Sequence, residues 1–298
     1  MAGPIEFILA GVLVGFCVGV TGVGGGSLMT PILISLFRIE PHIAIGTDLL
    51  YAAISKFCGS FVHAKKMNIV WPIVIWLAVG SIPASFATHW VLDNFLSQST
   101  HYKSVLTMVL GFMLTLTGIS IVFRTKIEAF FNRYRKDEQE DHSADLSRSN
   151  IALQAKNKRA LIVIMGVILG IFVTLSSVGA GAFGIMALVL MFPNLPMIRI
   201  IGSDVVHAVL LTLVAGLGYM SSGNVDFNLL MWLLVGSIPA IVVGTLLSSR
   251  LPEKIIRKVL GLTLMVIGIN FMINPVKAKP VENPTSAMIV NVEKNQLV

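Results

Sequence analysis

The sequence predicts an all-α polytopic membrane protein built from two homologous repeats. Its composition, its long uncharged runs and a motif pattern that occurs twice predict this class. The 298 residues have a mean hydropathy of +0.84, and 55% are hydrophobic while only 12% are charged. A soluble domain carries roughly 25% charged residues, so this composition excludes a soluble enzyme, a disulfide-rich secreted domain and a disordered regulator.

The uncharged runs give the membrane segments in chain order. A spanning helix needs about 20 apolar residues, because the hydrocarbon core is about 30 Å thick. Runs without Asp, Glu, Lys or Arg cover residues 7–37, 67–92, 104–123, 160–198, 205–225, 227–249 and 259–276. A further run, 41–64, is interrupted only by Asp48 and Lys56. We therefore expect about eight hydrophobic segments.

The first run of each half is too long for one spanning helix. Residues 7–37 and 160–198 number 31 and 39, which as straight helices would measure about 46 and 58 Å. Each contains a glycine-rich stretch, TGVGGGS at 21–27 and SSVGAG at 176–181. Glycine costs up to about 1 kcal/mol at each helical position, so we expect a break or a re-entrant turn at both places.

The chain repeats itself at an offset of about 155 residues. GVLVG at 11–15 resembles GVILG at 166–170, and VGSIPA at 79–84 recurs identically at 235–240. A GTD motif in the first half corresponds to a GSD motif in the second. Two homologous halves with broken segments in corresponding places are typical of secondary transporters.

These patterns divide the chain into a first transmembrane repeat at 1–123, a linker at 124–159, a second repeat at 160–273 and a disordered tail at 274–298. The linker holds nine of the Lys and Arg residues. Basic loops stay in the cytoplasm, so we expect the linker there. If both long runs turn back, the basic residues are distributed more unevenly between the two sides, and the halves are inverted with both termini outside. We expect this arrangement.

The charges and cysteines exclude further classes of function. The net charge is +7, from 22 Lys and Arg against 15 Asp and Glu, and the basic residues lie mostly between the apolar runs. This distribution indicates membrane orientation, with lipid and not nucleic acid as the surrounding partner. The only cysteines, Cys17 and Cys58, lie in apolar runs and form no CxxC motif. We expect no metal site and no cofactor.

The two glycine-rich breaks predict an anion site. A helix that begins inside the membrane presents backbone N–H groups and roughly half a positive charge, and glycine lets an anion approach them closely. The expected substrate-binding residues are Thr21, Gly22, Gly24, Gly25, Gly26, Ser27, Thr47, Ser176, Ser177, Gly179, Gly181 and Ser203. The alternative is that the glycines only permit close packing of helices.

Asp48 and Asp204 occupy corresponding positions in the repeats, inside apolar segments. A carboxyl group there costs about 2.5–3.5 kcal/mol on insertion scales, so each needs a partner or a role. Each acid either carries a coupling proton or caps exposed amides of a broken segment as a structural group, and the two acids need not share one role. Lys56, two helical turns beyond Asp48, either attracts the anion, pairs with Asp48 or extends to the membrane interface.

The sequence resembles the sulfite exporter TauE/SafE family, also described as the four-toluene sulfonate uptake permease family. The resemblance rests on GFCVGVTGVGGGSLMTP at 15–31, on GTD at 46–48 and on the weaker copy GSD at 202–204, and it spans about residues 5–273. It implies a permease of the bacterial inner membrane that moves small anions such as sulfite or sulfonates, coupled to the proton gradient. The second half departs from the first by having Ser177 in place of Gly22 and Ala180 in place of Gly25.

Two other functions remain open from the residues alone. An intramembrane aspartyl protease would use Asp48 and Asp204 to share a proton and activate water, but the matching contexts of the two acids favour a transporter, which is not an enzyme. An anion channel is the second alternative. The substrate, the direction of transport and homo-oligomer formation are not readable from the sequence, since small-residue faces serve internal packing and dimerisation alike.

Overall fold

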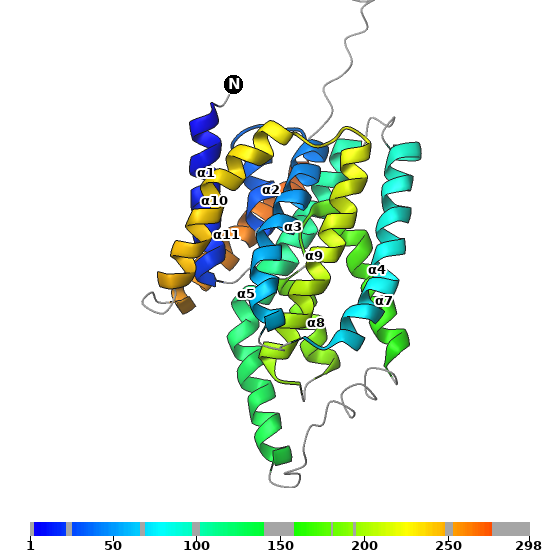
Figure 1. Cartoon of the computed structure of the whole chain (residues 1–298), viewed down its shortest axis with the longest axis vertical. Coiled ribbons are helices and arrows are strands. Elements are labelled where there is room, and N and C mark those ends of the chain that lie inside the picture. The colour runs from blue at the N-terminus through cyan, green and yellow to red at the C-terminus, as the bar shows by residue number, and fades with distance from the viewer. Residues whose placement is uncertain are drawn as a thin grey trace, which may run out of the picture.

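The computed structural model describes residues 3–21, 26–65, 69–96, 102–139, 158–179, 181–192, 195–247 and 253–275. Every regular element within these ranges is helical (Figure 1). The helices are α1 (Pro4–Thr21), α2 (Gly26–Ser35), α3 (Pro41–Lys65), α4 (Trp71–Val91), the short η1 (Leu92–Leu96), α5 (Tyr102–Gln139), α7 (Arg159–Ser176), α8 (Ala182–Met191), α9 (Met197–Ser221), α10 (Phe227–Leu247) and α11 (Glu253–Ile273).

Seven of the described helices are long and apolar enough to cross a membrane, which confirms a multi-pass membrane protein. They are α1, α4, the first part of α5, α7, α9, α10 and α11. The remaining expected segment forms α3, which is 25 residues long, as α9 is, and contains Asp48 and Lys56. The linker begins as a continuation of α5 up to Gln139, while 140–157 and the tail beyond Pro275 lie outside the described residues.

Both long apolar runs turn back instead of crossing. The ring of Phe7, near the start of α1, lies 5.0 Å from that of Phe37, just after α2. In the second half, Lys158 precedes α7 and donates a hydrogen bond of 2.6 Å to the carbonyl of Met191 at the end of α8. The end of each short helix therefore returns to the start of the long helix before it. The pairs α1–α2 and α7–α8 are re-entrant hairpins, named here the first and second hairpin.

One long helix of each half packs against the other half. Helix α1 packs along α10, and α7 packs along α4, with glycine at the points of closest approach. A side chain on Gly15 would collide with the backbone of Ser237, and one on Gly170 would collide with Ser81. Because lipid provides no hydrophobic drive between helices, such close backbone contact is the main source of attraction. The packing role proposed for glycine therefore applies to these residues outside the breaks.

Equivalent helices of the two halves pair in opposite directions. In α5 and α11, Gly111 lies against Gly268 while Gly118 lies against Gly261. In α3 and α9, Gly46 lies against Tyr219 and Asn224, whereas Gly216 lies against Leu50. Antiparallel pairing of equivalent helices is what an inverted repeat produces, because its two-fold axis lies in the membrane plane. Which end faces the cytoplasm stays a prediction.

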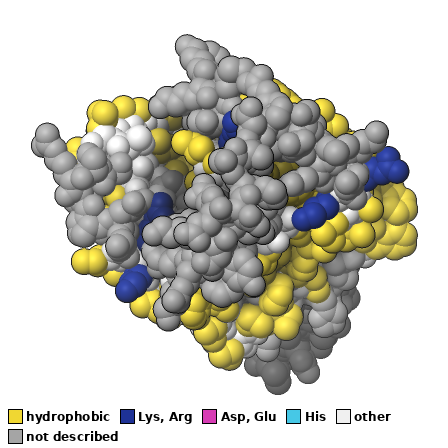
Figure 2. All heavy atoms as spheres, turned by 90° about the horizontal axis from the view of Figure 1, so that it is seen from below, with side chains coloured by type: hydrophobic (Ala, Val, Ile, Leu, Met, Phe, Trp, Pro, Cys, Tyr) yellow, Lys and Arg dark blue, Asp and Glu magenta, His cyan; other side chains and the backbone are white. Residues whose placement is uncertain are grey.

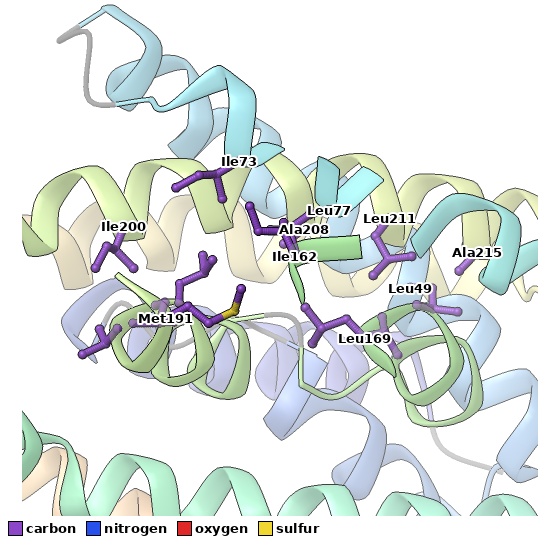
Figure 3. Close-up of a cluster of buried hydrophobic side chains, with 14 of the residues drawn as sticks. Leu49, Ile73, Leu77, Ile162, Leu169, Met191, Ile200, Ala208, Leu211 and Ala215 are labelled. Carbon is purple, nitrogen blue, oxygen red and sulfur yellow. The ribbon is translucent and has the colours of Figure 1, made fainter. Parts of the chain in front are cut away.

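Apolar side chains fill the bundle and also cover it. Figure 3 shows one buried cluster, in which Leu49, Leu77 and Leu211 lie where α3, α4 and α9 meet α7 and α8. Large hydrophobic side chains such as Ile5, Leu13 and Val266 are more than half exposed, as expected for a surface that faces lipid. Figure 2, seen from the end where α5 extends, shows Lys and Arg side chains among this hydrophobic surface.

Candidate functional site

The site lies where the hairpins break. In the second hairpin, α7 ends at Ser176, and Ser177 follows with φ of 57°, a left-handed conformation that few residues other than glycine adopt. Gly179 and Gly181 have φ of 110° and 139°, so the backbone requires glycine at both. In the first hairpin, α2 begins at Gly26, while Gly22, Gly24 and Gly25 lie outside the described residues.

Asp48 lies between the two hairpins. Its Oδ2 accepts a hydrogen bond from the hydroxyl of Thr30 on α2, and the backbone amide of Thr30 also faces the carboxylate. The hydroxyl of Ser177, from the break of the second hairpin, lies beside the same carboxyl group. Yet neither Asp48 Oδ1 nor Ser177 Oγ forms a hydrogen bond of ordinary geometry with any described residue, although these two residues are only 0% and 3% exposed.

Asp204 has a different environment. It lies against the first turn of α8, where a side chain on Gly184 would collide with its Oδ1. Asp204 is 1% exposed, and its Oδ2 has no hydrogen-bond partner within the part of the chain that the structure describes. At the position that corresponds to Thr30, α8 carries Ile185, which has no hydroxyl. Asp204 thus lacks the hydroxyl neighbour that α2 supplies to Asp48.

Lys56 is the charged residue that interacts with both acids. This half-buried side chain on α3 interacts electrostatically with Asp204 and, more weakly, with Asp48. The corresponding residue of α9 is Thr212, so the second half supplies no equivalent cation. Lys56 therefore interacts electrostatically with a second carboxylate besides the expected Asp48, and the interaction with Asp204 is the stronger one.

The acids lie far apart along the bundle. Leu50 packs on Gly216, so Asp48 is level with about residue 218 of the antiparallel α9. That residue is 14 positions from Asp204, which corresponds to about 21 Å at 1.5 Å per residue. Each acid belongs to a separate end of the site, with Lys56 between them.

The hydroxyls beside the acids hold the neighbouring helices. The backbone N–H of Asp226, just before α10, donates to Thr47 Oγ1 over 3.1 Å. In the other half, the N–H of Val70, just before α4, donates to Ser203 Oγ over 2.8 Å. The two contacts correspond to each other in the repeat. Thr47 and Ser203 thus bind backbone groups, which is a contact the sequence does not indicate.

The other expected residues surround the breaks. Thr21 ends α1 and donates its hydroxyl to the carbonyl of Cys17 over 2.6 Å, and Ser176 donates to the carbonyl of Phe172 over 2.7 Å. Ser27 is buried in the first turn of α2. The carbonyl of Thr21 accepts a hydrogen bond of 3.1 Å from Arg257 on α11. Most of the expected hydroxyl groups therefore lie near the two breaks.

Sequence reasoning missed Thr30, Gly184 and Arg257. Thr30 is in the motif region but 18 residues from Asp48, and only the hairpin brings them together. Gly184 stands alone in an otherwise apolar helix, which is the one signal that could have indicated a close approach. Arg257 lies 236 residues from its contact, so no local pattern reveals it.

A charged cluster lies at the corner between α2 and α3, where Glu40 is outside the membrane segments. Lys103 Nζ lies 2.6 Å from Glu40 Oε1, and His42 Nε2 lies 3.3 Å from Glu40 Oε2. The hydrogen bond from Lys103 holds the pKa of Glu40 below its usual range. This cluster fixes the end of the first hairpin to the start of α5.

Comparisons with known proteins give a family and relatives that are named as membrane transporters. A family model described as sulfite exporter TauE/SafE matches residues 7–271. The probable membrane transporter protein YjnA of Bacillus subtilis is 35% identical over 270 residues, which cover 90% of this chain and 99% of that relative. The probable membrane transporter protein MJ0441 of Methanocaldococcus jannaschii is 24% identical over 277 residues, which cover 87% and 92%. No solved structure matches.

Proposed function

Because the chain belongs to the sulfite exporter TauE/SafE family of membrane transporters, we propose that it transports small sulfur-containing anions, such as sulfite or sulfonates. A proton gradient drives this transport. One observation carries the proposal. Two re-entrant hairpins end inside the bundle, and a buried acid from α3 or α9 packs against each.

The hairpin ends supply the chemistry for an oxyanion. The first turns of α2 and α8 present backbone N–H groups that have no partner within their own helix, together with the positive end of the helix dipole. Gly26, Gly179 and Gly181 carry no side chain, and Ser27 adds a hydroxyl. Sulfite and sulfonate present three oxygens to such donors, and the description of the family names sulfite.

A shared-proton protease does not fit this arrangement. Two aspartates that activate one water must lie within a few ångströms of each other, because the pair shares one proton. Asp48 and Asp204 are about 21 Å apart along the paired helices. The proposal is therefore a transporter in which the two acids act separately.

Transport of labelled sulfite by purified protein in liposomes tests the proposal. We expect sulfite accumulation that depends on an imposed pH gradient and that an unlabelled sulfonate inhibits. Ser27→Ala removes a proposed anion donor and should weaken sulfite binding about tenfold or more, as expected for a hydrogen bond to a charged group. Thr263→Val, on the exposed face of α11, is the matched control and should transport normally.

Two results would contradict the proposal. Sulfite flux equal to that of empty liposomes would reject the substrate class. Flux that ignores the pH gradient and runs only down the sulfite gradient would indicate a channel or a uniporter.

A further inference from the structure

The surroundings of the two acids differ in a way that assigns them different roles. Asp48 has two hydroxyls beside it, from Thr30 and Ser177. The residues that correspond to Thr30 and Ser177 in the other half are Ile185 and Gly22, and neither has a hydroxyl. The second half therefore lacks the two side-chain ligands that converge on Asp48.

The atoms around Asp48 suit a small cation. One carboxylate oxygen, Asp48 Oδ1, and the hydroxyl oxygen of the neighbouring Ser177 are buried without hydrogen-bond partners among the described residues. Buried polar groups of this kind are costly unless something satisfies them. Oxygen atoms of carboxylates and hydroxyls are ligands for hard cations, and a carboxylate oxygen also accepts a proton.

The end of α7 strengthens this preference. Ser177 follows the last residue of α7, so the carbonyl end of that helix, which carries a partial negative charge, lies next to the Asp48 carboxylate. A carboxylate beside a helix C-terminus is repelled unless a positive charge lies with it. The titratable groups within the described residues that interact with Asp48 are Lys56 and Tyr51, both on α3.

Ser177 itself adds a second, independent observation. Its φ of 57° favours glycine, and the corresponding residue of the first hairpin is Gly22. Glycine at this position would relieve the backbone strain. The presence of serine instead indicates that its side chain has a function. That side chain points its hydroxyl to Asp48.

We propose that Asp48, Thr30 and Ser177 bind the small cation, H⁺ or Na⁺, that drives transport, and that Asp204 is the fixed counter-ion of Lys56. This assignment rests on the proposed function and deepens it by separating the coupling site from the structural charge pair. In this assignment the opposite charges of Asp204 and Lys56 balance each other through the cycle. Asp48 changes between a cation-bound and a cation-free form.

A binding measurement tests the site without any anion. The melting temperature of purified protein in detergent is compared in NaCl and KCl at equal ionic strength, and across a pH series. We expect the wild type to gain several degrees from Na⁺ or from acidification, since a ligand that binds only the folded state stabilises it. Ser177→Gly and Asp48→Asn should lose that gain, while the lipid-facing control Thr263→Val keeps it.

Ser177→Gly is the decisive variant because its backbone is relieved, not strained, by the change. Loss of the response cannot then come from misfolding. Ser221→Gly, at the exposed end of α9, is the matched serine-to-glycine control and should keep the full response. A wild type that responds to neither cation, or a Ser177→Gly variant with a normal response, would overturn the proposal.

Charge-pair variants test the assignment of Asp204. Asp204→Asn alone leaves Lys56 without its counter-ion and should lower the melting temperature, whereas the double variant Lys56→Gln/Asp204→Asn is neutral and should recover. We expect the double variant to retain the cation response. Loss of the response there, with retention in Asp48→Asn, would place the coupling site at Asp204 and refute the assignment.

A transport assay tests the cation site separately from the proposed substrate. In liposomes, Ser177→Gly should lower gradient-driven sulfite accumulation about tenfold or more, while exchange of labelled for unlabelled sulfite at equal pH and equal Na⁺ continues. Absence of sulfite flux in the wild type rejects the substrate class only, because the melting-temperature response still decides the cation site. A Na⁺ response in place of a proton response rejects proton coupling and supports the site.

Discussion

The two halves share a scaffold and differ in their polar groups. Thr47 and Ser203 make the same backbone contact in each half, and Gly15 and Gly170 make the same close approach. The surroundings of the two acids differ. Asp48 has hydroxyl neighbours, whereas Asp204 interacts mainly with the charge of Lys56. The two halves are therefore alike in the contacts that hold the bundle together and differ in the polar groups around the acids.

The orientation of the halves gives the largest, all-or-none prediction. In a variant without Cys17 and Cys58, a single cysteine at Gly3 or at Gly223 should react with a membrane-impermeant maleimide added to intact cells. A cysteine at Ser143, in the linker, should react only after the membrane is opened. Labelling of Gly3 and Gly223 from opposite sides would refute the inverted arrangement.

The shared packing predicts equal damage in both halves. Gly15→Val and Gly170→Val each force a side chain into the backbone of α10 or α4. We expect each variant to lose about 1–3 kcal/mol of stability, and more where the backbone cannot shift. The yield of monodisperse protein and the melting temperature measure this loss.

Gly3→Ala is the control for these variants, because no atom lies within 4 Å of the added carbon. It should behave as wild type. If only one of the two glycine-to-valine variants lost stability, the packing of α1 on α10 and that of α7 on α4 would not be equivalent.

The shared hydroxyl contacts predict a smaller effect. Thr47→Val and Ser203→Ala each leave a backbone N–H, of Asp226 or Val70, without its acceptor. A lost hydrogen bond to a buried or part-buried N–H costs about 1–2 kcal/mol. We expect similar decreases in the melting temperature for both variants, with sulfite affinity unchanged. A selective loss of sulfite affinity would instead assign these hydroxyls to the anion.

The smallest effect belongs to the surface cluster of the first hairpin. Lys103→Gln removes the partner that lowers the pKa of Glu40, so the pair stabilises the protein above the ordinary Glu pKa of 4.5 and loses that contribution as the pH falls. The pair is exposed, so the loss at neutral pH should be at most about 1 kcal/mol. Melting temperatures at pH 7 and pH 4 test this, and an equal difference at both pH values would contradict it.

The sequence predicts the spans and the breaks because both depend on local composition. Long apolar runs require helices in lipid, and the glycines at 22–26 and 179–181 mark where a helix is weakest. The repeat predicts corresponding positions for the two acids. Whether a long run crosses or turns back is decided by contacts such as Phe7 with Phe37, which no local pattern contains.

The polar contacts could not be predicted for the same reason. Lys56 and Asp204 are 148 residues apart in the chain, and they interact only because α3 and α9 pair in opposite directions. The sequence left three interpretations open for Lys56, and the fold gives it two carboxylate neighbours. Ser177 looks like an ordinary departure from glycine until its φ angle and its neighbour Asp48 are known.

The exchange of helices between halves has a consequence for how the protein is made. Gly11 on α1 contacts Leu233 on α10, and a ribosome that adds about 5–20 residues per second needs roughly 10–45 s to synthesise the chain between them. During that interval α1 resides in the bilayer without its partner. Biogenesis must therefore insert the helices first and assemble them afterwards, and a chain truncated after the first half would leave α1 without the helix on which it packs.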